Sequence, residues 1–119
     1  YALYPHAGDW LTGGVLAEAE ALNQPALARR VMADGPSSIT PVALTGLPVA
    51  LSGLKPAEDG SGLILRTYEP AGGRGEVEAR LPDGWRLGDE VTVLEDAAGP
   101  ADRRYLPFKL HSWKIEGPN

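Results

Sequence analysis

The sequence contains no cysteine. Disulfide frameworks, thiolate nucleophiles and cysteine-based zinc sites are therefore excluded for these 119 residues. The absence leaves the redox compartment open, and a cytoplasmic location is the default expectation.

Basic charge is also scarce, with 11 Lys and Arg against 16 Asp and Glu and a net charge of −5. Apart from two Arg-Arg pairs at 29–30 and 103–104 the basic residues are scattered, so no stripe could follow a phosphate backbone. No apolar run approaches the roughly 18 residues that span a bilayer, and no signal-peptide pattern is present. We therefore expect neither nucleic acid nor membrane as a partner.

The first residue is Tyr1 rather than methionine, and this suggests a fragment of a longer polypeptide. The length fits a single domain. We expect residues 1–46 to form a strand, a helix and an irregular lead-in, and residues 47–116 to form the main β region.

Glycine and proline are abundant, at 15 and 11 residues, which indicates many turns and many short strands. Turn clusters separate β-rich segments at roughly 8 to 15 residues, the spacing of a sandwich or barrel. The sequence predicts an all-β fold, an antiparallel β-sandwich with one short helix near the N-terminus. The expected strands are 1–4, 39–44, 49–54, 63–68, 76–81, 90–94, 105–108 and 109–115.

The one convincing helix covers residues 15–23, which are rich in Ala, Leu and Glu. We expect Thr12 to cap it, Asn23 to end it and Pro25 to stop any extension. Residues 26–32 fit either helix or strand.

Two strands show informative patterns. Residues 75–81 alternate charged and apolar side chains, as a half-buried strand does. In residues 108–115, Phe108, Leu110 and Ile115 reach a common core only if a bulge lies near Ser112 and Trp113.

Three adjacent acid pairs invite a glycosidase interpretation, because glycoside hydrolysis uses two carboxylates about one bond. Neighbouring strand residues point to opposite faces, and the pairs lie beside Gly or Pro in predicted turns. We favour solvated turn acids for Glu58-Asp59, Asp89-Glu90 and Glu95-Asp96.

His6, Asp9 and the distant His111 form only a weak metal pattern, and a corner with an Asx turn at Asp9 is the favoured interpretation. Gly72-Gly73-Arg74-Gly75 lacks the remainder of a phosphate loop and predicts a hairpin turn. Aromatic rings stack on sugars but more often pack in cores or between domains. The candidate carbohydrate or interdomain contacts are His6, Asp9, Trp10, Tyr68, Trp85 and Trp113.

Four blocks resemble the C-terminal region of family 38 glycoside hydrolases, the retaining α-mannosidases. Residues 1–10 match Tyr-Ala-Leu-x-Pro-His-x-Gly-x-Trp, and residues 22–25 match Leu-Asn-x-Pro after the helix. Residues 49–60 and 63–70 are similar to Val-x-Leu-Ser-x-Leu-Lys-x-x-Glu-Asp-Gly and Ile-x-Arg-x-Tyr-Glu. The ending, 106–115, resembles a Pro-Phe-Glu-Ile-x-Thr-Leu block but departs from it at Lys109, Ser112 and Trp113.

The resemblance implies a parent enzyme that cleaves terminal α-mannosides through a covalent intermediate, with zinc or another divalent metal in its catalytic part. Those catalytic and metal-binding motifs are absent here, so no catalytic residue and no cofactor is assigned to this chain. The chain is expected to be a non-catalytic β domain that packs against the catalytic and central domains of the parent, or that supports a homo-oligomer. The alternative is a carbohydrate-binding module for mannosides. On the packing interpretation, Tyr1, Tyr4, Trp10 and the helix lie in an exposed patch.

Overall fold

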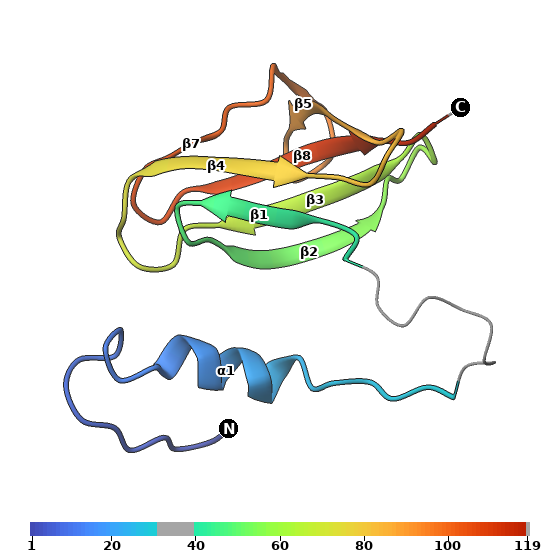
Figure 1. The fold of residues 1–119 in the computed structure, drawn as a ribbon. Coiled ribbons are helices and arrows are strands. Elements are labelled where there is room, and N and C mark those ends of the chain that lie inside the picture. The colour runs from blue at the N-terminus through green and yellow to red at the C-terminus, as the bar shows by residue number, and fades with distance from the viewer. Residues whose placement is uncertain (31–39, 119) are drawn as a thin grey trace. The chain divides into compact units, whose positions relative to one another are not determined.

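The computed structural model describes residues 1–30 and 40–118, and it divides into two compact units. The N-terminal unit covers Tyr1–Ile39, and the sandwich unit covers Thr40–Asn119. Figure 1 shows the helix of the N-terminal unit and the strands of the sandwich unit.

The sandwich unit contains two antiparallel sheets. The smaller has three strands in the order β1-β4-β7, and the larger has five in the order β2-β3-β8-β5-β6 (Figure 1). Some strands that neighbour each other in sequence, such as β3 and β4, therefore lie in different sheets. The strands are β1 (Ala43–Gly46), β2 (Ala50–Pro56), β3 (Leu63–Tyr68), β4 (Gly75–Arg80), β5 (Arg86–Val91), β6 (Ala97–Gly99), β7 (Arg104–Tyr105) and β8 (Leu110–Glu116).

The core between the sheets is built from alternate strand residues. β8 contributes Trp113 and Ile115, β3 contributes Leu65, β4 contributes Val77 and β7 contributes Tyr105, all with at most 1% of their surface exposed. The period of two along each strand sends these side chains to one face. This confirms the alternation predicted for residues 75–81, and the two packed sheets confirm the predicted all-β fold.

The opposite face of the larger sheet has a second, smaller core. Ile64 and Val91 pack there with Ala57, and all three are buried. The connection between β5 and β6 lies over this face, because Arg66 on β3 donates to the carbonyl of Val93. The larger sheet is thus covered on both faces along part of its length.

β8 has no bulge near Ser112 and Trp113, which was the condition for Phe108 and Leu110 to reach the core. β8 pairs regularly with β3 from Leu110 to Ile115, and the irregularity lies in β5, which advances three residues from Leu87 to Glu90 while β8 advances two. Phe108 and Leu110 consequently do not reach the core and are 67% and 42% exposed.

The helix α1 (Val15–Asn23) has the predicted bounds, but its capping differs. The N-cap is Gly14 in a left-handed conformation, with no side-chain cap. Thr12 instead donates its hydroxyl to Asp9. None of the nine helical residues is buried, and in the described residues no helix is long and apolar enough to cross a membrane.

Other strand predictions need correction. Residues 1–4 form no strand, and residues 26–30 are irregular, while residues 31–39 lie outside the described part. The extended segment expected at 39–44 begins at Ala43, and the strand expected at 90–94 ends at Val91. Residues 72–75 make no hairpin, because they connect β3 to β4 in the other sheet.

Candidate functional site

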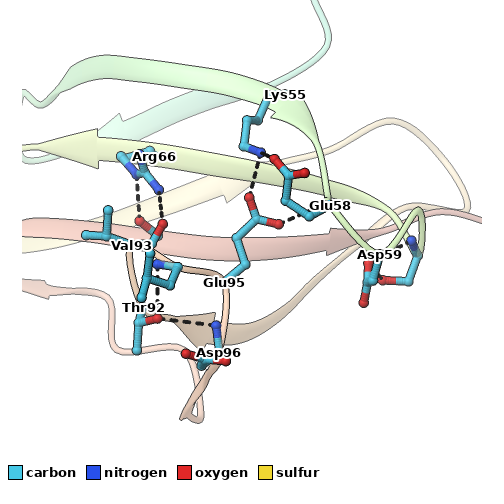
Figure 2. A network of polar contacts seen from close by, with 11 residues as sticks. Lys55, Glu58, Asp59, Arg66, Thr92, Val93, Glu95 and Asp96 are labelled. Carbon is cyan, nitrogen blue, oxygen red and sulfur yellow. Dashed lines mark hydrogen bonds and ion pairs between the residues drawn. The ribbon is translucent and has the colours of Figure 1, made fainter.

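A network of ion pairs and hydrogen bonds in the sandwich unit lies where the 92–96 connection meets the end of β2. The ammonium of Lys55 lies 2.6 Å from Glu95 Oε1 and 2.7 Å from Glu58 Oε1 (Figure 2). The other oxygen of Glu95 accepts a hydrogen bond from the backbone N–H of Glu58 at 2.8 Å. Glu58 and Glu95, 37 positions apart in sequence, are therefore joined both directly and through the ammonium of Lys55.

Local hydrogen bonds give the 92–96 connection its shape. Thr92 Oγ1 accepts from the backbone N–H groups of Leu94 and Asp96, both at 3.2 Å (Figure 2). Arg66 holds the connection to the sheet, with one guanidinium nitrogen donating to Val93 O at 3.3 Å and another to Ser112 Oγ at 3.0 Å. The network therefore fixes a loop on a sheet face.

A shallow pocket beside this network has an apolar floor of Ala57, Ile64 and Val91 and a rim of charged side chains. Two rim carboxylates, Glu58 and Glu95, lie side by side, but the Lys55 ammonium occupies the space between them. Two carboxylates about a glycosidic bond need that space for the sugar. The arrangement fits a structural ion pair network better than a glycosidase site.

Hydrogen bonds favour the ionised form of two carboxylates in this region, Glu95 and Asp59. The backbone N–H of Glu58, followed by Lys55, keeps the pKa of Glu95 below its ordinary value. The hydroxyl and N–H of Ser61, followed by Lys114, lower the pKa of Asp59 to about 2. Hydrogen bonds to Glu58 and then to Glu95 raise the pKa of Lys55. A general acid in glycoside hydrolysis needs a raised carboxyl pKa, which is the opposite direction.

His111 lies in the core. Its Nδ1 is 2.7 Å from Glu90 Oε1, its Nε2 is 3.1 Å from the carbonyl of Arg104, and none of its side chain is exposed. The ring stacks on Trp113 and meets Tyr105 edge to face. Both ring nitrogens are thus occupied by protein groups and neither is available to a metal.

The acid-pair prediction therefore holds only in part. The side chains of four of the six acids are exposed, as expected. Glu90 and Glu95 are not solvated turn acids, because one bonds His111 within the sandwich and the other bonds Lys55 and the backbone of Glu58.

Glu69 is a functional candidate that the sequence analysis missed. Its side chain is 1% exposed, and it accepts backbone hydrogen bonds from Ala71 at 2.8 Å, Gly72 at 2.7 Å and Phe108 at 3.0 Å. Burial opposes its ionisation, but these N–H donors, with Gly73, outweigh burial and lower the pKa of Glu69. The sequence signal is an acid at a strand end before a glycine-rich segment, whose free N–H groups need an acceptor.

In the N-terminal unit, Asp9 organises a turn. Its Oδ1 accepts from the N–H of Leu11 at 3.0 Å and of Thr12 at 2.7 Å, which forms the predicted Asx turn. The bonds from Thr12 lower the pKa of Asp9. His6 stacks against Tyr4, and Trp10 is 45% exposed at the turn.

The remaining candidates lie apart on the sandwich unit. Trp113 is fully buried, so its ring offers no face to a sugar. Trp85 is partly buried and packs against the core and Gly117. Tyr68 is 37% exposed at the end of β3, paired with Leu110. These three residues do not converge on a common site.

Comparison with known proteins identifies the sandwich. The glycosyl hydrolases family 38 C-terminal beta sandwich domain matches residues 48–116, which are 69 of the 119 residues and include β2 to β8. No curated protein and no solved structure matches the chain. The match confirms the resemblance drawn from the sequence, and the chain belongs to the glycosyl hydrolase family 38 C-terminal β-sandwich domain family.

Proposed function

We propose that this chain is a non-catalytic part of a family 38 α-mannosidase, in which it packs against the catalytic and central domains. The parent enzyme hydrolyses terminal α-mannosides, and a cytoplasmic location belongs to the same proposal. The observation that carries the proposal is the set of contacts made by Glu58 and Glu95. The family match relates the chain to glycosidases, but the Lys55 ammonium bonds both carboxylates and the backbone N–H of Glu58 donates to Glu95.

The N-terminal unit supports a packing role. Its helix has no buried residue, and a nine-residue helix is too short to be stable alone in water. Exposed apolar side chains of this kind are expected where another domain covers them. The exposed large apolar residues of the unit are Tyr1, Leu3, Tyr4, Trp10, Leu11, Leu22 and Leu27.

Zinc belongs to the parent enzyme by resemblance, and the residues described here do not fit it. In the described ranges no three His, Cys, Asp or Glu side chains gather as a metal site would require. His111 has both nitrogens engaged. The metal ligands of the parent are therefore proposed to lie elsewhere in its chain, and no catalytic step is assigned to these residues.

The test is hydrolysis of a chromogenic α-mannoside by this chain and by the full parent enzyme, with zinc added to both. The proposal expects turnover by the parent alone. Turnover by the 119-residue chain would overturn it and return attention to Glu58 and Glu95.

Mannoside binding is the second candidate, and the exposed ring of Trp10 beside the Asp9 turn favours it. Titration of the chain with mannose and mannobiose, monitored by tryptophan fluorescence, distinguishes the packing role from mannoside binding. The packing role predicts no saturable change. Saturable quenching that Trp10→Ala abolishes would establish the binding module instead.

A further inference from the structure

One end of the sandwich unit exposes a group of large apolar side chains. Tyr68 ends β3 and pairs with Leu110 at the start of β8, and the connection before β8 carries Leu106 and Phe108. The exposed fractions are 37% for Tyr68, 42% for Leu110, 53% for Leu106 and 67% for Phe108. We call these four residues the apolar end.

Phe108 has an unusual backbone. Its φ is +60°, a left-handed conformation that a bulky side chain seldom adopts. Such outliers persist only where the surroundings hold them, and they cluster at functional positions. Here the conformation turns an aromatic ring towards solvent.

Glu69 holds this conformation. The buried carboxylate accepts the N–H of Phe108 at 3.0 Å, and the backbone N–H of Glu69 donates to Lys109 O at 2.9 Å. The same carboxylate accepts from Ala71 and Gly72, so both connections at this end share one anchor. The apolar end is therefore preorganised rather than a loose loop, and preorganisation lowers the entropic cost of binding.

Charge at this end indicates the character of the partner. Arg104 pairs with Glu76 and Lys109 with Asp102, but among the described residues no ion pair includes Arg74 or Arg103. Arg74 follows the Glu69-anchored connection, and because Gly75 pairs with Tyr105 it lies next to Leu106, whereas Arg103 lies opposite Val77, farther along β4. An exposed guanidinium group beside an apolar group fits an apolar pocket with a carboxylate at its rim.

We propose that the apolar end docks into an acid-rimmed apolar pocket on another domain of the parent hydrolase. This inference rests on the proposed packing function, since the family match makes the sandwich one domain of a larger enzyme. Phe108 is the central contact, Arg74 orients it, and Glu69 acts as a positioning residue.

The test compares Phe108→Ser with Val93→Ser, a control at a residue that is 66% exposed on a different connection. Each substitution is made in the parent enzyme and in the 119-residue chain. We expect Phe108→Ser to lower the melting temperature of the parent by about 3 °C and to leave that of the chain unchanged, with no effect of Val93→Ser in either. Equal shifts for the two substitutions, or an equal loss in chain and parent, would overturn the proposal.

Charge reversal gives an independent measurement. Arg74→Glu in the parent is expected to increase hydrogen exchange at residues 106–110 roughly tenfold or more, because the docked segment then opens more often. Unchanged exchange would contradict the acidic rim, and a dimer of the isolated chain that Phe108→Ser dissolves would show that the occupant is a second copy. Mannoside hydrolysis by the parent and by the chain is measured in parallel, so unchanged exchange and melting temperature, with turnover by the parent alone, reject this inference and leave the proposed function standing.

Discussion

At the scale of single residues, the buried polar groups are expected to affect the free energy of unfolding more than the exposed acids do. Glu69 is the clearest case, because three backbone N–H groups converge on a carboxylate that is 1% exposed. Hydrogen bonds to a charged group stabilise a protein by about 1.5–3 kcal/mol. We therefore expect Glu69→Gln to lower the free energy of unfolding of the chain by about 2 kcal/mol at pH 7.

The same bonds predict a pH dependence. The folded-state pKa of Glu69 is lowered, so its stabilisation is complete above the unfolded-state value of about 4.3 and is lost as the pH falls through the folded-state value. Urea denaturation of wild type and Glu69→Gln from pH 7 to pH 2 measures it. The difference between them is expected to shrink on acidification, and a constant difference would contradict the role given to the ionised carboxylate.

Tyr105 and Thr67 form a buried hydroxyl pair whose coupling can be measured. The phenol of Tyr105 bonds Thr67 Oγ1, both residues are at most 1% exposed, and burial raises the pKa of Tyr105. Tyr105→Phe leaves the threonine hydroxyl unsatisfied and is expected to cost about 1–3 kcal/mol. Adding Thr67→Val is expected to restore part of this loss in urea denaturation, whereas additive losses would show that the pair does not interact.

At the scale of elements, period-two patterns predicted the strands that lie within regular sheets. β3 has its predicted bounds, and β4 begins one residue before its predicted start. Both could be predicted because β3 is rich in β-forming residues and β4 alternates charged and apolar residues. The exposure of Leu110 follows from regular alternation in β8, which sends His111, Trp113 and Ile115 to the core, whereas that of Phe108 could not be predicted because its connection is anchored by the distant Glu69. Glu95 and Lys55 meet only after folding brings positions 40 apart together.

The turn that leaves β1 depends on glycine. Gly46 has φ +96°, and a Cβ there would lie 2.3 Å from the carbonyl oxygen of Glu76 on β4. Gly53, in β2, has an ordinary φ and nothing within 4 Å of an added Cβ. We expect Gly46→Ala to lower the melting temperature of the chain by about 8 °C or more, the effect of roughly 2 kcal/mol, and Gly53→Ala to be nearly neutral. Equal tolerance at both positions would contradict the β1–β4 pairing.

At the scale of the whole molecule, membership of a glycosidase domain family and the proposed lack of a catalytic role rest on different observations. Membership follows from the match over 48–116, and the first ten residues already suggested it from their sequence. The proposed lack of a catalytic role depends on the geometry, because the sequence shows acid pairs but not the lysine and backbone donors that engage them.

The most direct measurement is mannoside hydrolysis by the parent enzyme carrying Glu58→Gln and Glu95→Gln together. Removing a catalytic acid or base slows a reaction by about 10²–10⁴-fold. Because these carboxylates bind Lys55, we predict that kcat stays within about twofold of the wild-type value. Stability should fall, little from Glu58, which is 81% exposed, and more from Glu95, which is 11% exposed and also accepts a backbone N–H. If kcat instead fell by about two orders of magnitude or more while the variant stayed folded, the non-catalytic account would be contradicted.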